Sequence, residues 1–538
     1  MSRELSQDDN GGGSPGVRVS TSAASRPRLD DTYRGVQRLF GSHSRILGAI
    51  ALTVIFVVLT AVYIQLSFSR PKSSDDASFV QEAQDILGGN ILLRGWSIAL
   101  DSYYAVVLPL YAIGGLLVPR LSLLLYLVNP IIYALTVIAC LAIGWVYTEP
   151  RNRLIGMCLL FAVVALPSTL ITDFNVNYIA HVSTVLCVLL TFHLIVADYS
   201  LVLAALPLVL AAIGDPLALY IGNLPLAVVG LWLGLKDPRH YLRLAVFSVS
   251  CVIVSKIALA TMMLAGGFKQ LPIIAHFVSA DQLSQNIYLL WVSILDLFGA
   301  DFFGRNVFNA GTAAILVHAA VMILALWLVC EASVRALRRE ENLMTTLLCA
   351  SLVLTAIEFV FSDRQAGGGR YLTTVPIFGA LIAAMSWQRV IVRKYALYLL
   401  PVVACAYFGA IAAQMFEPIA KPPMTVVKFL EDNGLTEGYG SYWSASILSV
   451  LSEGKLVVRQ VGGAREGIVP LRRSSSEQWY AMKDARFLIY KDKAFGAGPF
   501  KAVTTWGPPL QLKQIDGYTV MIWDSPLHVP LQGDDFPP

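Results

Sequence analysis

The chain has 538 residues, 56% of them hydrophobic and only 14% charged, with a formal net charge of +4. Soluble proteins carry about a quarter of their residues as charged side chains. The composition therefore argues against a soluble enzyme and indicates apolar surface that faces lipid. The small net charge gives no support for a nucleic-acid partner.

Residues 1–45 are rich in Gly, Ser, Asp and Arg, with almost no apolar clustering before Tyr33. Such a composition buries too little apolar surface to fold, so it predicts a disordered tail. The apolar run 46–68 that follows is too long for the hydrophobic region of a secretory signal and has no A-x-A exit. We interpret it as a first membrane span that is not cleaved.

Apolar runs near the bilayer-spanning length of about 20 residues recur along most of the chain. The eleven predicted spans are 46–68, 121–147, 154–170, 182–197, 201–213, 217–235, 244–265, 307–330, 343–361, 371–387 and 395–416. The expected fold class is therefore an all-α polytopic membrane domain over residues 46–416.

Lys and Arg in the short connections predict the orientation, because cytoplasmic loops are enriched in both. With the N-terminus inside, every basic cluster falls in an inner loop: Arg151 and Arg153; Lys236, Arg239 and Arg243; Arg335, Arg338 and Arg339; Arg389, Arg393 and Lys394. This predicts an inner or plasma membrane protein with a cytoplasmic N-terminus. Loops 69–120 and 266–306 and residues 417–538 then lie on the outer side.

Two segments leave alternatives open. The pair 201–213 and 217–235 is short for two spans, so a re-entrant hairpin is a second interpretation. The run 103–118 is apolar but short, and we interpret it as an interfacial helix with its tyrosines at headgroup level. A similar interfacial helix is expected at 287–298.

Residues 417–538 form a polar segment of domain size. A helix-like pattern covers 424–434, and strand-like patterns cover 455–461, 485–491 and 517–523. This alternation predicts a small α/β or α+β domain on the outer face.

The first outer loop contains SSDDASFVQEAQDILGGN (73–90), in which Asp75 and Asp76 precede a helical pattern that Gly88-Gly89 end. Carboxylates at this position gain hydrogen bonds from the helix N-terminus and the favourable end of its dipole. The pair is therefore interpreted either as a plain helix cap or as a general base at the membrane surface.

This loop resembles the first loop of the GT-C glycosyltransferases, a superfamily that includes protein O-mannosyltransferases and the aminoarabinose and galacturonate transferases of lipid A. The residues that carry the resemblance are Asp75, Asp76, Phe79, Ala83, Ile86, Leu87, Gly89 and Asn90. The stretch LYAIGGLLVPRL (110–121) resembles the juxtamembrane helix that leads into the second span. Asp76 departs from the Glu that many members have, which leaves open which of the pair is the base.

The resemblance implies an enzyme, a hexosyl- or pentosyltransferase of GT-C type, with no cofactor. Its donor would be a polyprenyl-phosphate-linked sugar, and its acceptor a cell-envelope glycan, lipid or protein, as in lipopolysaccharide or polysaccharide modification. A first-loop carboxylate, Asp75 or Asp76, would deprotonate the acceptor hydroxyl. Because no outer loop contains the D-x-D motif of the oligosaccharyltransferase branch, we expect no metal ion.

The leaving phosphate needs cations, and the segment DRQAGGGRYL (363–372) offers Arg364 and Arg370 beside three glycines. RYL followed by Pro376 also resembles a late-span signature of the superfamily. An arginine that anchors the interface is the other interpretation. Lys256, near the middle of a predicted span, is a further candidate because an ionisable group there is costly.

Other candidates have equally ordinary alternatives. Asp173 matches a second acidic residue of related enzymes, but it is also interpretable as a simple loop aspartate. Four residues of the first loop could line a sugar pocket or serve as interfacial anchors: Arg94, Trp96, Asp101 and Tyr104.

Two other classes of protein remain as alternatives. The first is a lipid or solute transporter of the cell envelope, which inverted repeats and broken helices at the midplane would favour. A membrane assembly protein without catalysis would use residues 417–538 as its binding module. The large outer loops favour a surface enzyme.

Overall fold

The computed structural model describes residues 42–178, 181–271, 276–306, 308–363, 368–387, 396–464, 467–491 and 498–530. The chain divides into two compact units, Met1–Val54 and Ile55–Pro538. The predicted disordered tail, 1–45, lies almost entirely outside the described residues. The second unit holds every contact discussed below.

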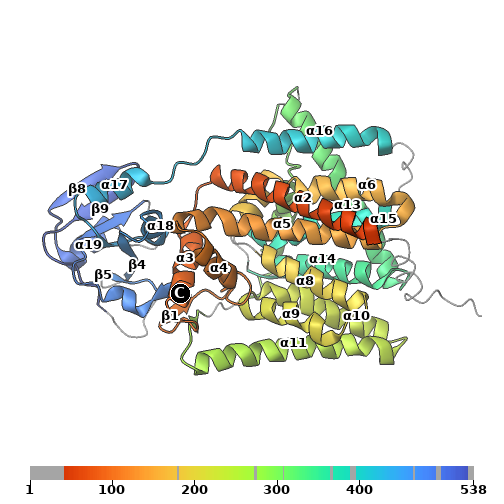
Figure 1. Ribbon diagram of the computed structural model, residues 1–538, viewed down its shortest axis with the longest axis horizontal. Coiled ribbons are helices and arrows are strands. Elements are labelled where there is room, and N and C mark those ends of the chain that lie inside the picture. Colours follow the sequence, from red (N-terminus) through yellow and green to blue (C-terminus); the bar gives the residue numbers. More distant parts are fainter. Residues whose placement is uncertain are drawn as a thin grey trace, which may run out of the picture. The chain divides into compact units, whose positions relative to one another are not determined.

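The protein is mostly helical, with a small strand-containing domain at its C-terminal end. The helices of the membrane region are α2 (Ser42–Phe68), α5 (Leu121–Tyr147), α6 (Arg153–Leu160), α7 (Thr169–Ile171), α8 (Val182–Val196), α9 (Leu201–Gly214), α10 (Leu224–Gly234), α11 (Pro238–Leu264), α12 (Leu283–Leu297), α13 (Ala310–Leu337), α14 (Leu343–Phe361), α15 (Thr374–Ser386) and α16 (Ala396–Met415). Short 3-10 turns occur at η1 (Pro150–Asn152) and η5 (Gly368–Leu372). The helices of the second unit run side by side (Figure 1).

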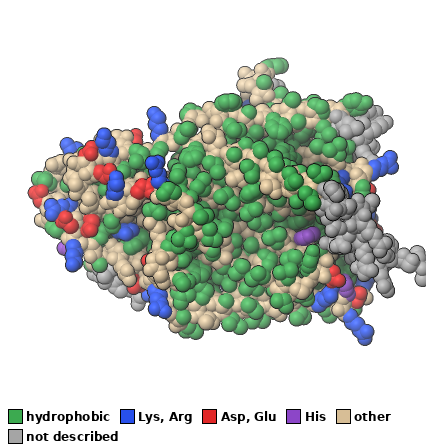
Figure 2. Space-filling model, viewed as in Figure 1, with side chains coloured by type: hydrophobic (Ala, Val, Ile, Leu, Met, Phe, Trp, Pro, Cys, Tyr) green, Lys and Arg blue, Asp and Glu red, His purple; other side chains and the backbone are tan. Residues whose placement is uncertain are grey.

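Six helices within the described residues are long and apolar enough to cross a membrane: Ile46–Phe68, Leu121–Tyr147, Pro238–Leu264, Ala310–Leu337, Leu343–Phe361 and Tyr398–Met415. A seventh crossing is added if the bent pair Pro150–Ala165 and Thr169–Asn177 forms one broken span. Hydrophobic side chains dominate the visible face over the helices, and charged ones gather over the strands (Figure 2). The chain is an integral membrane protein, as the composition predicts.

The remaining predicted spans are also helical, but they are shorter than a bilayer-crossing helix. For example, α8 has 15 residues, α9 has 14 and α15 has 13. At about 1.5 Å per residue these helices fall short of a hydrocarbon core of about 30 Å. π-Helical turns interrupt others, at η2 (Phe161–Ala165), η3 (Thr172–Asn177) and η4 (Leu219–Asn223). Length alone therefore supports fewer spans than the eleven predicted from apolar runs.

The first loop contains α3 (Ser74–Leu87), strand β1 (Trp96–Ile98) and α4 (Leu108–Leu117). The predicted helix is confirmed, but it begins at Ser74, so Asp75 and Asp76 lie in its first turn rather than before it; Gly88 is its C-cap, and Gly89 has φ 101°. The predicted placement of tyrosines at the lipid headgroups is wrong for Tyr103 and Tyr111, which are 3% and 0% exposed. Helix α4 packs against α3, and the ring of Phe79 in α3 lies 6.0 Å from the Tyr103 ring and 6.2 Å from the Tyr111 ring.

The C-terminal domain contains α17 (Met424–Asp432), β3 (Glu437–Gly440), α18 (Tyr442–Leu451), β4 (Val457–Ala464), β5 (Gly467–Pro470), β6 (Ser475–Ser476), η8 (Glu477–Tyr480), β7 (Phe487–Tyr490), α19 (Pro499–Trp506), β8 (Gln511–Ile515) and β9 (Tyr518–Ile522). The described strands of its main sheet are ordered β5-β4-β3-β7-β9-β8, with β3 parallel to β4 and β7. The predicted helix and strands are confirmed, and the domain is of the mixed α and β type.

A second, three-stranded sheet joins segments far apart in the sequence. Strand β1 of the first loop pairs in parallel with β2 (Lys269–Gln270) and antiparallel with β6 of the C-terminal domain. A carboxylate strengthens the junction, because Glu453 accepts hydrogen bonds from the backbone N–H groups of Leu121 and Ser122, at the start of α5. Helix α18 packs directly on α3 (Figure 1). The C-terminal domain is thus built onto the first loop.

Candidate functional site

The start of α3 separates the two aspartates that the sequence leaves equivalent. Asp76 is 1% exposed, and its Oδ2 accepts hydrogen bonds from the backbone N–H (3.1 Å) and hydroxyl (2.9 Å) of Ser73. Ser73 in turn accepts from the Asp76 N–H, which completes a capping box. Burial raises the pKa of Asp76 to about 6, although Lys72 opposes this. Asp76 therefore has the contacts of a structural cap.

Asp75 is half-buried and faces the C-terminal domain. Its Oδ1 accepts a hydrogen bond from the hydroxyl of Tyr442, the first residue of α18. Burial, followed by the charge of Asp75, raises the pKa of Tyr442 well above its usual value, so the phenol keeps its proton and donates. The guanidinium of Arg473 lies over the Tyr442 ring, 5.3 Å from its centroid. An acidic group, a hydroxyl and a cation thus adjoin at this point.

A second polar group lies around the buried pair His181 and Asp215. His181 Nδ1 is 2.8 Å from Asp215 Oδ2 and 3.1 Å from the hydroxyl of Tyr103. Thr184 and the backbone N–H of Leu217 also donate to Asp215. Burial acts to raise the pKa of Asp215, but these partners outweigh it and hold the pKa below its usual value. Asp215 is therefore a buried carboxylate.

Arg370, in the 3-10 turn η5 just before α15, adjoins the second group. Its Nη2 donates to the hydroxyl of Tyr371 at 2.9 Å, and its guanidinium lies 4.9 Å from the centroid of that ring. The Tyr371 ring lies 4.9 Å from the His181 ring. Arg370 itself is exposed.

Asp101 is coupled electrostatically to residues of both groups. Burial raises its pKa, whereas His181 and Arg370 are near enough to lower it. Burial acts to lower the pKa of Arg473, but Tyr442, Asp75 and Asp101 outweigh it and raise that pKa. The charges of Asp75 and Asp101 both act on the pKa of Arg473, and the charge of Arg370 acts on that of Asp101, so these three predicted residues are coupled electrostatically.

The backbone next to this cluster adopts an uncommon conformation. Tyr103 has φ 49° and Ser474 has φ 47°, in the left-handed region that residues other than glycine rarely occupy. The Tyr103 N–H donates to the Gly214 carbonyl at 2.9 Å, and a Cβ on Gly214 would lie 2.9 Å from the Tyr103 Cα. Residues held this way cost about 1–3 kcal/mol, and the described chain holds others in the same region: Leu93, Asp198, Arg339, Glu453 and Asp516.

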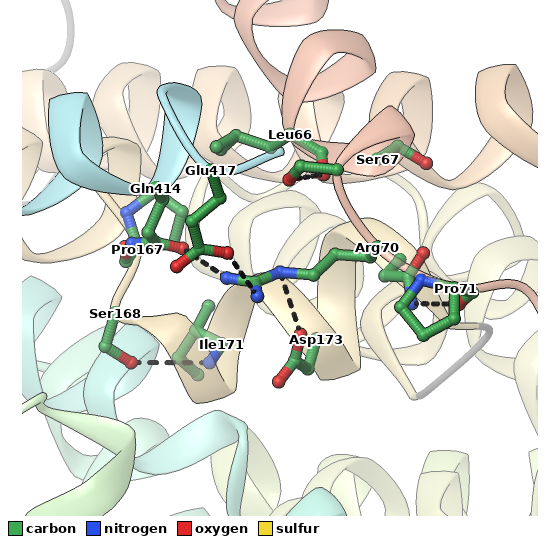
Figure 3. Close-up of polar contacts among 12 residues, drawn as sticks. Leu66, Ser67, Arg70, Pro71, Pro167, Ser168, Ile171, Asp173, Gln414 and Glu417 are labelled. Carbon is green, nitrogen blue, oxygen red and sulfur yellow. Dashed lines mark hydrogen bonds and ion pairs between the residues drawn. The ribbon is translucent and has the colours of Figure 1, made fainter. Parts of the chain in front are cut away.

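Asp173 belongs to a different cluster, drawn in Figure 3. Arg70, just after α2, forms ion pairs with Asp173 in η3 (Nε–Oδ1, 3.2 Å) and with Glu417 (Nη1–Oε2, 2.6 Å). Its Nη2 donates to the Gln414 side chain, whose amide donates to the Pro167 carbonyl at 3.0 Å. One guanidinium thus joins three segments, and Asp173 is one of its acceptors.

The other predicted residues lie apart or serve the fold. Trp96 is 2% exposed, donates to Asp85 Oδ2 at 2.6 Å and packs edge-on against Trp479. The hydroxyl of Tyr104 donates to the Ile91 carbonyl. The side chains of Arg94 and Lys256 are exposed, Lys256 on the outer surface of α11. Arg364 lies outside the described residues.

Sequence reasoning missed Tyr442, Arg473, His181 and Asp215 as members of these polar groups. Tyr442 follows Asp75 by 367 positions, and no local pattern connects them. Within the described residues, no three His, Cys, Asp or Glu side chains come together as metal ligands would. No protein-family model matches this chain, and no curated protein matches it.

Proposed function

We propose that this integral membrane protein is a GT-C-type glycosyltransferase. It moves a sugar from a polyprenyl-phosphate donor to a cell-envelope glycan, lipid or protein on the outer face of the membrane. The observation that carries the proposal is the surroundings of Asp75: a half-buried carboxylate at the start of a juxtamembrane helix, with a cation, Arg473, beside its hydrogen-bonding partner.

In the proposed reaction Asp75 is the general base. The acceptor hydroxyl loses its proton to Asp75 while its oxygen bonds to the anomeric carbon of the donor. The bond from that carbon to the phosphate oxygen breaks, and the phosphate leaves with the electron pair. Cations near the leaving group stabilise the charge that develops there. Asp76 is too enclosed for this role, because it caps α3 and is 1% exposed.

The strand pairing supports the proposed topology. Strands β1, β2 and β6 pair with one another, so they lie on one side of the membrane. The chain must therefore cross an even number of times between β2 and β6. Helices α13, α14 and α16 give three crossings, so a fourth is required, and α15 is the apolar helix that lies between α14 and α16. This supports a crossing at 371–387, as the eleven-span topology requires.

The polar contacts support the same arrangement for the shorter helices. His181 and Asp215 meet Tyr103 of the first loop. Helices α8 and α9 lie between those two residues, so the chain leaves the side of the first loop and returns within these two short helices. On this topology the basic clusters face the cytoplasm, and the first loop and C-terminal domain are extracytoplasmic.

The test is sugar transfer by purified protein from a panel of polyprenyl-phosphate hexoses and pentoses to a lipid and glycan extract of cell envelopes. Asp75→Asn keeps the size of the side chain but removes its basicity, so we expect turnover to fall about a hundredfold or more. Asp76→Asn is the matched control and should retain most activity, because Asn caps helices about as well as Asp. Near-normal transfer by Asp75→Asn would contradict the proposed mechanism.

A transporter of lipids or solutes is the second candidate, favoured by the broken helix. The segments Pro150–Ala165 and Thr169–Asn177 are bent by 62° relative to each other across the break at residues 166–168. Discontinuous helices line the substrate sites of many transporters. Movement of a polyprenyl-phosphate sugar across vesicles, with no release of polyprenyl phosphate, would favour this candidate over the glycosyltransferase.

A further inference from the structure

We propose that Arg473 of the C-terminal domain and Arg370 of η5 together bind the phosphate group of a lipid-linked donor. The inference rests on the proposed function and assigns to the C-terminal domain a direct part in the site. It makes Arg473 a ligand-binding residue that no motif in the sequence indicates.

Arg473 has hydrogen-bonding capacity that the protein does not use. Its guanidinium lies over the Tyr442 ring, and its Nε is buried with no acceptor within reach among the described residues. A buried N–H without a partner costs about 1–3 kcal/mol. A ligand that supplies an oxygen here recovers that cost, and a phosphate oxygen fits a guanidinium well.

The small sheet brings Arg473 to the first loop. Ser475 in β6 pairs with Ser97 in β1, in antiparallel register. Arg473 is two residues before Ser475, so it lies next to the strand that pairs with β1, and Asp101 follows β1 closely in the sequence. The left-handed conformation of Ser474 sits at the turn that delivers Arg473 to this position.

Arg370 reaches the same place from the membrane domain. The contacts run from Arg370 to Tyr371 (2.9 Å), from the Tyr371 ring to His181 (4.9 Å), and from His181 to Tyr103 (3.1 Å), two residues after Asp101. Asp101 is consequently within electrostatic range of both arginines. Two guanidinium groups from different domains are thus coupled electrostatically to one carboxylate.

This arrangement suits a phosphate better than a neutral sugar. Each guanidinium presents parallel N–H donors that match two phosphate oxygens. The rings of Tyr442 and Tyr371 lie under the two cations and restrict their orientation. Asp75 adjoins Arg473 through Tyr442, so a phosphate held here lies next to the proposed base. The leaving group and the base would then share one site, as glycosyl transfer requires.

The experiment measures binding of polyprenyl phosphate to the full-length protein in nanodiscs of neutral lipid. Arg473→Gln should weaken binding about 10- to 100-fold, the range expected when a charge-assisted hydrogen bond worth about 1.5–3 kcal/mol is lost. Arg472→Gln, the adjacent arginine, is the matched control and should bind like the wild type. Equal affinities of the Arg473→Gln variant and the wild type would overturn the proposal.

Competitors identify the source of the phosphate. Inorganic phosphate at millimolar concentration should compete with polyprenyl phosphate, since both present the same oxygens. Equal displacement by phosphatidylglycerol and by polyprenyl phosphate would overturn the assignment to the donor. Binding that depends on Arg473, without sugar transfer from any donor in the panel, would leave the phosphate site standing and refute the glycosyltransferase.

Discussion

Arg70 and Arg473 both connect distant parts of the chain, but they differ in what their donors reach. The Arg70 guanidinium contacts Asp173, Glu417 and Gln414, and its side chain is only 14% exposed. Arg473 leaves a buried Nε without an acceptor among the described residues. Arg70 Nε, Nη1 and Nη2 each face a protein oxygen, at 3.2, 2.6 and 3.4 Å, whereas no ion pair joins Arg473 Nε to an acidic side chain among the described residues.

This difference offers a criterion for separating charges that hold segments of the fold together from charges that are available to a ligand. A guanidinium whose donors are used holds segments together. A guanidinium with spare donors, next to strained backbone and a half-buried carboxylate, is available to a ligand. Asp76 and Asp75 repeat the contrast, since the first caps a helix and the second faces Tyr442.

The largest expected effect concerns topology, because it is all-or-none. Lys513 is exposed in β8, and Arg338 is exposed at the end of α13. In a background without native cysteines, Lys513→Cys should react with an impermeant maleimide added to intact cells, and Arg338→Cys should react only after lysis. The reverse pattern would put both arginine clusters on the cytoplasmic side and exclude an outer site.

A smaller effect is expected in the pH dependence of stability. Because the pKa of Asp76 is raised from 3.8 to about 6, the folded protein keeps a proton that the unfolded chain loses between these values. Stability contributed by this group is thus full below about pH 4 and is lost as the pH rises through 6. The shift corresponds to about 3 kcal/mol.

Asp76→Asn removes this titration, so the thermal midpoint of the variant should change less between pH 4 and 6.5 than that of the wild type. Lys72 does not interfere. Burial lowers the pKa of its amine to about 8, so the amine titrates above this pH window. Parallel pH profiles of the two proteins would show that Asp76 is not enclosed as described.

Much of the architecture is predictable from local patterns. The helix over 74–87, its glycine end and the strands of the C-terminal domain follow from periodicity, capping and turn residues, which act over a few positions. Which charged residues come together in space is harder to predict from local sequence patterns. Asp75, Asp101 and Arg370 are recognisable as candidates, but their companions Tyr442 and Arg473 come from a separate domain.

The prediction fails where tertiary contacts decide. Trp96 has an aromatic side chain of the kind that stacks on sugars, yet it is enclosed by Asp85 and Trp479. Asp173 has the sequence position of a second acidic site residue, yet its carboxylate forms an ion pair with Arg70. The number of spans is similarly underdetermined by apolar runs, because short helices and π-helical turns divide them; pairing of β1 with β2 and β6 constrains it instead.

The most direct test of the contrast measures thermal stability and polyprenyl-phosphate affinity on the same two variants. Arg70→Gln should lower stability by about 1–2 kcal/mol, discounted because Asp173 and Glu417 are 33% and 41% exposed, and should leave affinity near that of the wild type. Arg473→Gln should do the opposite, with a thermal midpoint close to that of the wild type and binding at least tenfold weaker. Loss of stability without loss of affinity in Arg473→Gln, or loss of affinity in Arg70→Gln alone, would contradict the account.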